Sequence, residues 1–483
     1  MTRGLLCLYG LIFAVVVCFV AHVRGANVTL MDSRAKSLAA AIDVVDHGGP
    51  PLLGSTKPYT DPWQTTPGQA YFAAGFSDDP GIYVYLPEAG HALGVSNPLT
   101  LLKWFSYGSF ALLIVFYPLL FYELFASAAA AIFAPIAPTA FAFGANSDIY
   151  WIPAWCALAV LPVLMLVVAR RWRAWSTAAC IAAGVVASYA GSIRSQAGLG
   201  VAIAALGVVL FHAPGWRRRV VVGAAVVLAY LSIRPLTIDA LQAYRNHEIE
   251  AYIHTHSVWS ESSSTGHPFW HSTYIGLGYL PNRWGIYWND ASAADYVRRV
   301  DPTAPYLSAR YSHILEHRYF TILREDPGFV LRTYAKKAAI ELNQALSHFV
   351  PGLILLPPLL LFGSRRRLLR RWVFIVLPTL VIQLVPPVLT LPGVYGLGFI
   401  GAVALLALLG ACAALAVAEA RVHAWVNDGG NLVPSIQRDA VPRGRAAAAV
   451  GAVVVLVAAT AGVHSQQKVL RPGSAIARPS APA

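Results

Sequence analysis

The chain has 483 residues, a formal net charge of +13 and a composition that is 57% hydrophobic but only 12% charged. Soluble globular domains usually carry about a quarter charged residues, so this balance excludes an ordinary soluble protein and indicates a lipid environment. The five cysteines all lie within apolar runs and form no Cys-x-x-Cys sequence, which argues against a disulfide framework or a zinc cluster.

Long apolar runs recur along the chain. A run of about 18 or more residues can cross a bilayer as one helix, and a helix is required there because lipid cannot bond to free backbone groups. We therefore predict an all-α polytopic membrane protein with about eleven transmembrane helices. The predicted spans are Leu5–Val23, Trp104–Phe121, Ala126–Phe143, Tyr150–Ala169, Ser176–Ser192, Ala197–His212, Val220–Arg234, Leu346–Gly363, Trp372–Val388, Gly393–Ala418 and Ala446–Val463.

Arginine residues in the short connections predict the orientation of these spans. Lysine and arginine are enriched in cytoplasmic loops, and a cytoplasmic N-terminus places every arginine cluster on that side. The clusters contain Arg3, Arg170, Arg171, Arg173, Arg217, Arg218, Arg219, Arg365, Arg366, Arg367, Arg370, Arg371, Arg438, Arg443 and Arg445. We expect a multi-pass protein of the plasma (inner) membrane, in which topology rather than nucleic-acid binding explains the net charge.

The spans divide the chain into an anchor, two extracytoplasmic segments, two groups of spans and a tail. The first span is expected to be a retained anchor, because Val23-Arg24-Gly25-Ala26 is a poor signal-peptide cleavage site. The parts are residues 1–23 (anchor), 24–103 (first extracytoplasmic segment), 104–234 (spans two to seven), 235–345 (second extracytoplasmic segment, mainly helical and rich in aromatic and histidine residues), 346–463 (spans eight to eleven) and 464–483 (a tail predicted to be disordered).

The spans carry almost no ionisable residue at mid-depth, and no internal repeat is evident, so a transporter gains no support. The sequence also has no Walker A loop and no Gly-x-Ser-x-Gly elbow, which disfavours an ATP site and a serine hydrolase. We therefore expect any chemistry on the extracytoplasmic face.

The end of the second extracytoplasmic segment predicts two helices. Apolar and aromatic residues share one face of Ser308–Glu325. Asp326-Pro327 then indicates an N-cap followed by proline at the first helical position, so a second helix is predicted over Pro327–Gln344. Lys336 and Lys337 on this helix are expected near the lipid headgroups.

The first extracytoplasmic segment contains two adjacent carboxylates, Asp78 and Asp79, before a Pro-Gly turn. Neighbouring carboxylates can bind a divalent cation such as Mg or Mn, or raise one pKa so that the group works as a general base. The alternative is an exposed turn, since Asp and Pro-Gly are common turn residues.

This layout resembles the GT-C superfamily of polytopic glycosyltransferases, in which a first span leads into an outer loop with an acidic pair and further spans follow. The resemblance implies transfer of a sugar from a polyprenyl-phosphate donor to a glycan, lipid or protein acceptor outside the cytoplasm. It implies that Asp78 or Asp79 activates the acceptor hydroxyl. The pair lies further from the first span than in many members, which leaves Asp32, Asp43, Asp46 and Asp61 as competitors.

Arg194 is one of very few basic residues in the short outer turns. A guanidinium suits bidentate contact with a phosphate, so Arg194 is predicted to bind the donor phosphate. The alternative is an arginine that extends to the interface and anchors a helix end.

The second extracytoplasmic segment interleaves aromatic rings with polar side chains, as sugar-binding sites do. His267 and His271 could also share a helical face and bind zinc, although no third ligand stands at a recognised spacing. Enrichment of Tyr and Trp at membrane interfaces is the plainer alternative. The candidate binding residues are His267, Trp270, His271, Tyr274, Arg283, Trp284, Asn289 and Asp290.

The resemblance to the GT-C superfamily implies a membrane glycosyltransferase of cell-envelope glycan biosynthesis, and this is the function we expect. A polysaccharide or lipid-glycan polymerase, ligase or flippase is the first alternative, because it shares the outer segments but needs no acidic pair. A non-catalytic membrane scaffold, whose outer segments bind a partner, is the second.

Overall fold

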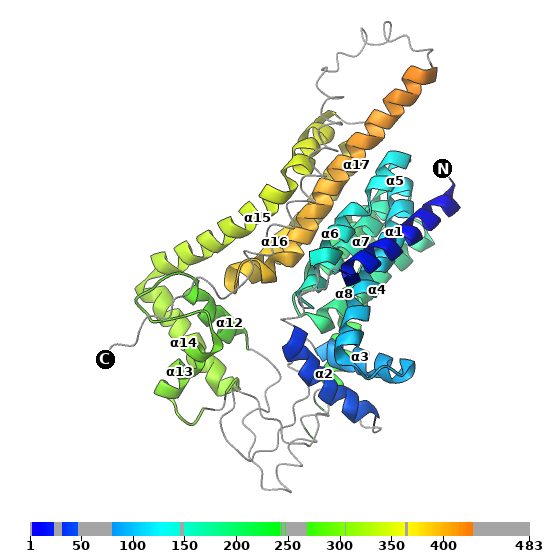
Figure 1. Ribbon diagram of the computed structural model, residues 1–483. Helices are drawn as coiled ribbons and strands as arrows, with labels where there is room; N and C mark the ends of the chain where they lie inside the picture. Colours follow the sequence, from blue (N-terminus) through cyan, green and yellow to red (C-terminus); the bar gives the residue numbers. More distant parts are fainter. Residues whose placement is uncertain are drawn as a thin grey trace.

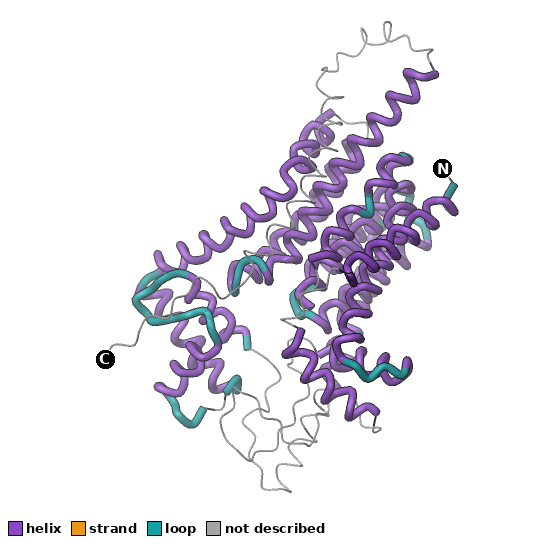
Figure 2. Tube along the Cα trace, in the orientation of Figure 1, coloured by secondary structure: helices purple, strands orange, loops and turns teal. Residues whose placement is uncertain are grey.

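The computed structural model describes residues 2–23, 31–46, 80–144, 149–241, 243, 247, 268–304, 306–362 and 366–427. Every regular element in these ranges is a helix (Figure 2). The helices that carry the description below are α1 (Arg3–Val23), α2 (Met31–Asp46), α3 (Pro80–Leu93), α4 (Pro98–Phe125), α5 (Ala128–Phe133), α6 (Ile136–Gly144), α7 (Ile152–Ala169), α8 (Ala174–Ile193), α9 (Leu199–His212), α10 (Trp216–Ser232), α12 (Phe269–Gly276), α13 (Asp290–Val300), α14 (Ala309–Glu325), α15 (Pro327–Phe362), α16 (Arg366–Leu389) and α17 (Leu397–Asn427).

Six helices in the described residues are long and apolar enough to cross a membrane, and the number rises to eight if each of two bent pairs is one span. The bent pairs are α10 with Pro235–Leu241, and the two halves of α15, which meet at 86° between Ser347 and Gly352. The described part of the chain is thus all-helical, and its apolar helices are those of a multi-pass membrane protein. The predicted count of about eleven spans is not confirmed, and the predicted last span, Ala446–Val463, lies outside the described residues.

Two predicted boundaries need correction. Helix α4 begins at Pro98, well before the predicted Trp104, because the Asn97 side chain caps it by accepting the Thr100 N–H at 3.0 Å. The predicted third span is not one helix. It is divided into α5 and α6 next to Pro135, which has no N–H to donate.

Helices α7 and α17 form the centre of the bundle. Nearly every side chain of α7 is buried, which fits a helix that is apolar on all sides. Helix α17 packs along both α7 and α15 (Figure 1). A Cβ at Gly352 of α15 would lie 2.5 Å from the Ala407 carbonyl oxygen of α17, so glycine permits this close helix contact.

Helices α12, α13, α14 and the first turns of α15 form a small helical domain with its own hydrophobic core. It lies beside the bundle, at the lower left of Figure 1. The two helices predicted here are confirmed: Ser308 caps α14, and Asp326 caps α15 by accepting the Phe329 N–H at 3.0 Å. Helix α15 then continues from this domain into the bundle.

Polar contacts join the chain segments at one end of the bundle, here named the Arg3 end. The Arg3 Nε donates to Glu123 at 2.8 Å, and Arg170 bonds to the other oxygen of the same carboxylate. Helices α2, α3 and α12 to α14 lie toward the opposite end (Figure 1). Arg3 and Arg170, which were predicted on the same side of the membrane, thus share one end of the bundle.

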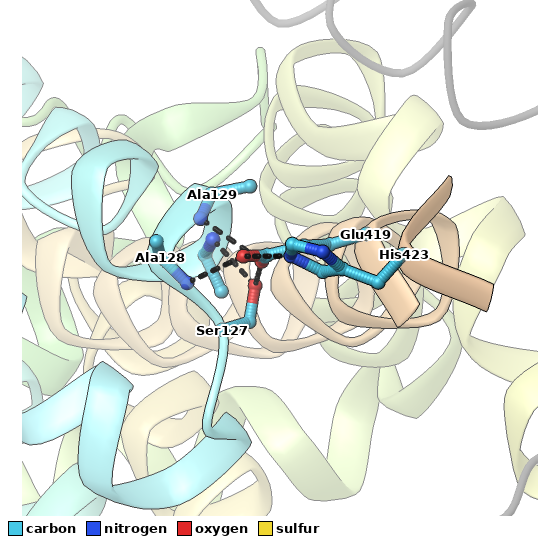
Figure 3. Close-up of polar contacts among 6 residues, drawn as sticks. Ser127, Ala128, Ala129, Glu419 and His423 are labelled. Atoms are coloured by element: carbon cyan, nitrogen blue, oxygen red, sulfur yellow. Dashed lines mark hydrogen bonds and ion pairs between the residues drawn. The ribbon is translucent and has the colours of Figure 1, made fainter. Parts of the chain in front are cut away.

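A second contact at the Arg3 end joins α17 to the start of α5. Glu419 accepts the Ala128 and Ala129 N–H groups, each at 3.2 Å, and the Ser127 hydroxyl (Figure 3). The first N–H groups of a helix have no partner within the helix, and a carboxylate there also interacts favourably with the helix dipole. Glu419 thus fixes α17 against the α4–α5 turn.

Candidate functional site

Arg194 follows the last residue of α8, at the end of the bundle opposite Arg3, and only 3% of its surface is exposed. Its guanidinium carbon lies 4.1 Å from the centre of the Tyr150 ring and 5.2 Å from the centre of the Tyr395 ring. A cation over an aromatic face is stabilised by the electrons of the ring. The fold therefore places Arg194 against two tyrosines that are remote in sequence and whose ring centres are 5.3 Å apart, and we name these three residues the Arg194 cluster.

The turn after Arg194 is held by α8 and α16. A Cβ at Gly198 would lie 1.9 Å from the Ala187 carbonyl oxygen, so only glycine allows this approach. From α16, Thr379 donates to the Gly200 carbonyl oxygen at 2.7 Å, and both Thr379 and Gln383 are buried. These contacts fix the backbone that presents Arg194.

Helix α3 packs against the end of α8. A Cβ at Gly81 would lie 2.6 Å from the Ser192 Oγ, and the Tyr85 and Tyr189 ring centres are 5.0 Å apart. The first turn of α3 therefore touches the last turn of α8, which leads into Arg194. The predicted catalytic pair, Asp78 and Asp79, precedes α3 directly and lies outside the described residues.

Three of the competing aspartates, Asp32, Asp43 and Asp46, lie on α2. Asp46 lies 3.0 Å from the His91 Nδ1, which ties α2 to α3, and its side chain is part exposed. Asp43 is only partly buried on α2, and Asp61 lies outside the described residues.

His271 is a buried residue of the small helical domain. Its Nδ1 lies 2.8 Å from the Tyr311 hydroxyl and its Nε2 lies 3.1 Å from Asp290. Both ring nitrogens are thus engaged, which leaves no lone pair for a metal. His267 lies outside the described residues, and within those residues no group of three or more His, Cys, Asp or Glu could hold a metal ion.

Of the aromatic candidates of this domain, Tyr274 is a core residue, and Trp270 and Trp284 are partly buried against the core. Tyr274 is 2% exposed, and burial raises its pKa to about 12. Trp270 packs on Tyr319, with ring centres 5.4 Å apart, and Trp284 lies beneath the guanidinium of Arg318. The structure brings these candidates into one domain, and their role in binding a substrate stays a prediction.

The remaining polar candidates stabilise the same domain. Asn289 caps α13 by accepting the Ser292 N–H at 2.7 Å. Arg283 lies over the Trp284 ring and 3.8 Å from Asp326. Trp288 belongs to the same aromatic stretch, although it was not among the candidate residues. Its ring centre is 6.3 Å from that of Tyr395, so it connects this domain to the Arg194 cluster.

Lys337 and Glu341 were also missed, and both are fully buried on α15. The expectation that Lys337 reaches the headgroups is wrong, whereas Lys336 is exposed. The Lys337 Nζ donates to the Leu389 and Thr390 carbonyl oxygens at 3.3 and 2.7 Å, and Glu341 accepts the Gly393 N–H at 3.1 Å. Their i, i+4 spacing with Thr333 marks a polar helix face that could have been found in the sequence.

A cavity lies near the first residues of α8, at the end of this helix away from Arg194. Its volume is about 290 Å³, and it is lined by Arg170, Arg171, Arg173 and Trp175. It belongs to the Arg3 end, so it is separated from Arg194 by the length of α8.

Comparison with known proteins adds no relative: no family model, no curated protein and no solved structure matches this chain.

Proposed function

We propose that this protein is a membrane glycosyltransferase that moves a sugar from a polyprenyl-phosphate donor to an extracytoplasmic acceptor. The observation that carries the proposal is the buried Arg194 at the point where α8 meets α3, the helix that directly follows Asp78-Asp79. The proposed topology keeps about eleven spans and a cytoplasmic Arg3 end.

Arg194 supports the donor half of this proposal. A guanidinium cannot lose its charge in a protein, and its planar fork matches two phosphate oxygens. Its position at a bundle end, outside the centre of the spans, suits a phosphate at the surface of a bilayer. The rings of Tyr150 and Tyr395 stabilise the charge of the guanidinium by cation–π contact.

The acidic pair supports the acceptor half. Asp79 is bonded to Pro80, and Gly81 packs on Ser192, two residues before Arg194. In the proposed reaction the acceptor hydroxyl attacks the anomeric carbon, and its proton passes to Asp78 or Asp79. The bond from that carbon to the phosphate oxygen breaks, and the phosphate leaves with the bonding electrons. A divalent cation would bind these same carboxylates.

Mass spectrometry of membrane lipids and surface glycans tests the proposal. Cells would carry wild type, Asp78→Asn, Asp79→Asn or Arg194→Gln at matched expression. Asp295→Asn and Arg217→Gln serve as controls, because Asp295 and Arg217 are exposed residues remote from the Arg194 cluster. The proposal expects a polyprenyl-phosphate sugar to accumulate, and one sugar to disappear from a glycan, in the three site variants alone.

Other patterns decide between the alternatives. Dependence on Arg194 with indifference to both aspartates would favour the polymerase, ligase or flippase. Normal glycans in every variant and in a deletion strain would favour the scaffold, for which the small helical domain with its separate core is the partner-binding part.

A further inference from the structure

We propose that Lys337 and Glu341 are positioning residues that hold the 389–396 loop, between α16 and α17, so that Tyr395 stays against Arg194. The inference rests on the proposed function only for the identity of the ligand that Arg194 binds. The positioning itself stands on contacts among described residues.

Both side chains contact the loop from the same face of α15. Lys337 bonds to the carbonyl oxygens of Leu389 and Thr390, where the loop begins, and Glu341 bonds to the Gly393 N–H, two residues before Tyr395. The lysine donates and the carboxylate accepts, so each charge meets backbone dipoles of the favourable sign. The loop is thus attached at two points on one helix.

The loop backbone is shaped for this approach. Gly393 has φ +88°, a region that residues with a side chain rarely adopt. A Cβ at Gly396 would lie 1.6 Å from the Glu341 Oε1. Gly393 and Gly396, one on each side of Tyr395, therefore let the backbone of the loop approach the Glu341 carboxylate closely.

Burial argues for a specific role of the two charges. Both side chains have 0% exposure, and charged groups are rarely buried completely because removing them from water is costly. Apolar residues of similar size would fill the same space at lower cost, but they could not bond to the loop. The pair therefore gives the loop one defined position.

The small helical domain meets the bundle at the same place. A Cβ at Gly276, the last residue of α12, would lie 2.1 Å from the Leu389 carbonyl oxygen and 3.1 Å from the Lys337 Nζ. The Trp288 ring of this domain also packs edge-on toward Tyr395. Lys337 thus lies where the domain, α15 and the loop come together.

Hydrogen–deuterium exchange on the full chain in lipid nanodiscs tests the contact with the loop. We expect amides in 389–396 to exchange about tenfold faster or more in Lys337→Met and Glu341→Leu, because each substitution destabilises the conformation of the loop that protects these amides from exchange. Glu341→Gln keeps an acceptor oxygen and should exchange more slowly than Glu341→Leu. Lys336→Met and Glu325→Gln are matched controls at exposed positions of the same region. Unchanged exchange in folded Lys337→Met and Glu341→Leu would overturn the proposal.

Binding of farnesyl phosphate, a short polyprenyl phosphate, tests the link to Arg194. We expect Lys337→Met to weaken binding about tenfold in the wild-type background and to add little in an Arg194→Gln background. If Lys337→Met and Arg194→Gln weakened binding independently and additively, the positioning role would be overturned, even if the loop exchanges faster. Absence of binding by wild type would overturn the proposed function and the ligand part of this inference, whereas the exchange result would still decide the loop contact.

Discussion

Arg194 and Tyr150 form the closest cation–ring contact of the site, with 4.1 Å between the guanidinium carbon and the ring centre. Arg194 ends α8, and Tyr150 precedes α7, so the contact joins two neighbouring helices at one end of the bundle. This contact holds the guanidinium against the face of the Tyr150 ring, where the ring electrons stabilise its charge.

Arg194→Gln should weaken binding of a polyprenyl phosphate by about ten- to a hundredfold, since a charged hydrogen bond contributes about 1.5–3 kcal/mol. Arg194→Lys keeps the charge but loses the planar fork, so it should recover only part of the affinity. The measurement is a titration in nanodiscs, with Arg217→Gln as a control. Equal affinity of all variants would show that Arg194 only anchors a helix end.

His271→Ala should destabilise the small helical domain by about 2–4 kcal/mol, because it leaves a cavity and buried partners without a hydrogen bond. Proteolysis within residues 268–326 should become faster. His313→Ala, at an exposed position of α14, should change little. A chelator should have no effect on wild type. If it does destabilise wild type, a metal site involving residues outside the described ranges must exist.

The sequence predicted the helical segments better than the site, for a physical reason. Helices α14 and α15 follow from local signals, namely an apolar face and the caps Ser308 and Asp326. The Arg194 cluster depends on long-range packing: Tyr150, Arg194 and Tyr395 are brought together only by the fold. Arg194 was identified because a lone arginine in an outer turn is unusual, whereas tyrosines near an interface are common.

The burial of individual side chains was harder to predict than the positions of the helices. His271 and Tyr274 have the residue types of a sugar site, but the structure buries both in a core. Lys337 has the residue type of an interfacial anchor, but its ammonium bonds to backbone carbonyls. Composition cannot separate these roles, because they depend on the direction in which each side chain points.

Stability of the small helical domain should depend on pH through Asp301. The Thr303 hydroxyl, then the Thr303 N–H and Arg310, favour the charged form and lower the pKa of Asp301 below its ordinary 3.8. A lowered folded-state pKa stabilises the domain above pH 3.8, and this contribution is lost as pH falls through the folded value.

Asp301→Asn should therefore lower the unfolding temperature near neutral pH, and its difference from wild type should shrink as the pH falls below 3.8. Both the unfolding temperature and its dependence on pH can be measured by monitoring thermal unfolding through hydrogen–deuterium exchange of the α13 and α14 amides. Asp295→Asn is the control, as an exposed aspartate of the same domain. A difference that is constant with pH would assign the effect of Asp301 to packing alone.

Glu419→Ala should loosen the Arg3 end by about 1–2 kcal/mol, because it removes the acceptor for the first N–H groups of α5. The amides of Ala128 and Ala129 bond to Glu419 (Figure 3), so their faster hydrogen–deuterium exchange would show this loosening directly. His423→Ala should have a small effect, since this exposed residue lies 3.9 Å from Glu419. The proposed sugar transfer at the Arg194 end should persist in both variants, and its loss would indicate that the two ends are coupled.

The contact between α3 and α8 gives the sharpest test of whether the acidic segment acts together with Arg194. Gly81→Ala places a Cβ 2.6 Å from the Ser192 Oγ, so α3 must move away from α8 at a cost of about 1–3 kcal/mol. We expect sugar transfer to fall while farnesyl phosphate binding at Arg194 is retained. Gly108→Ala, in α4 with no atom within 4 Å of the added Cβ, is the matched control.

Adding Ser192→Gly removes the hydroxyl that the new methyl group meets, and it should restore part of the transfer activity in the Gly81→Ala background. Such recovery would mean that the spacing of α3 and α8 sets the reaction, because neither change adds a functional group. If Gly81→Ala transfers sugar at the wild-type rate, the position of α3 does not matter, and the base must be sought outside the segment that begins with Asp78-Asp79.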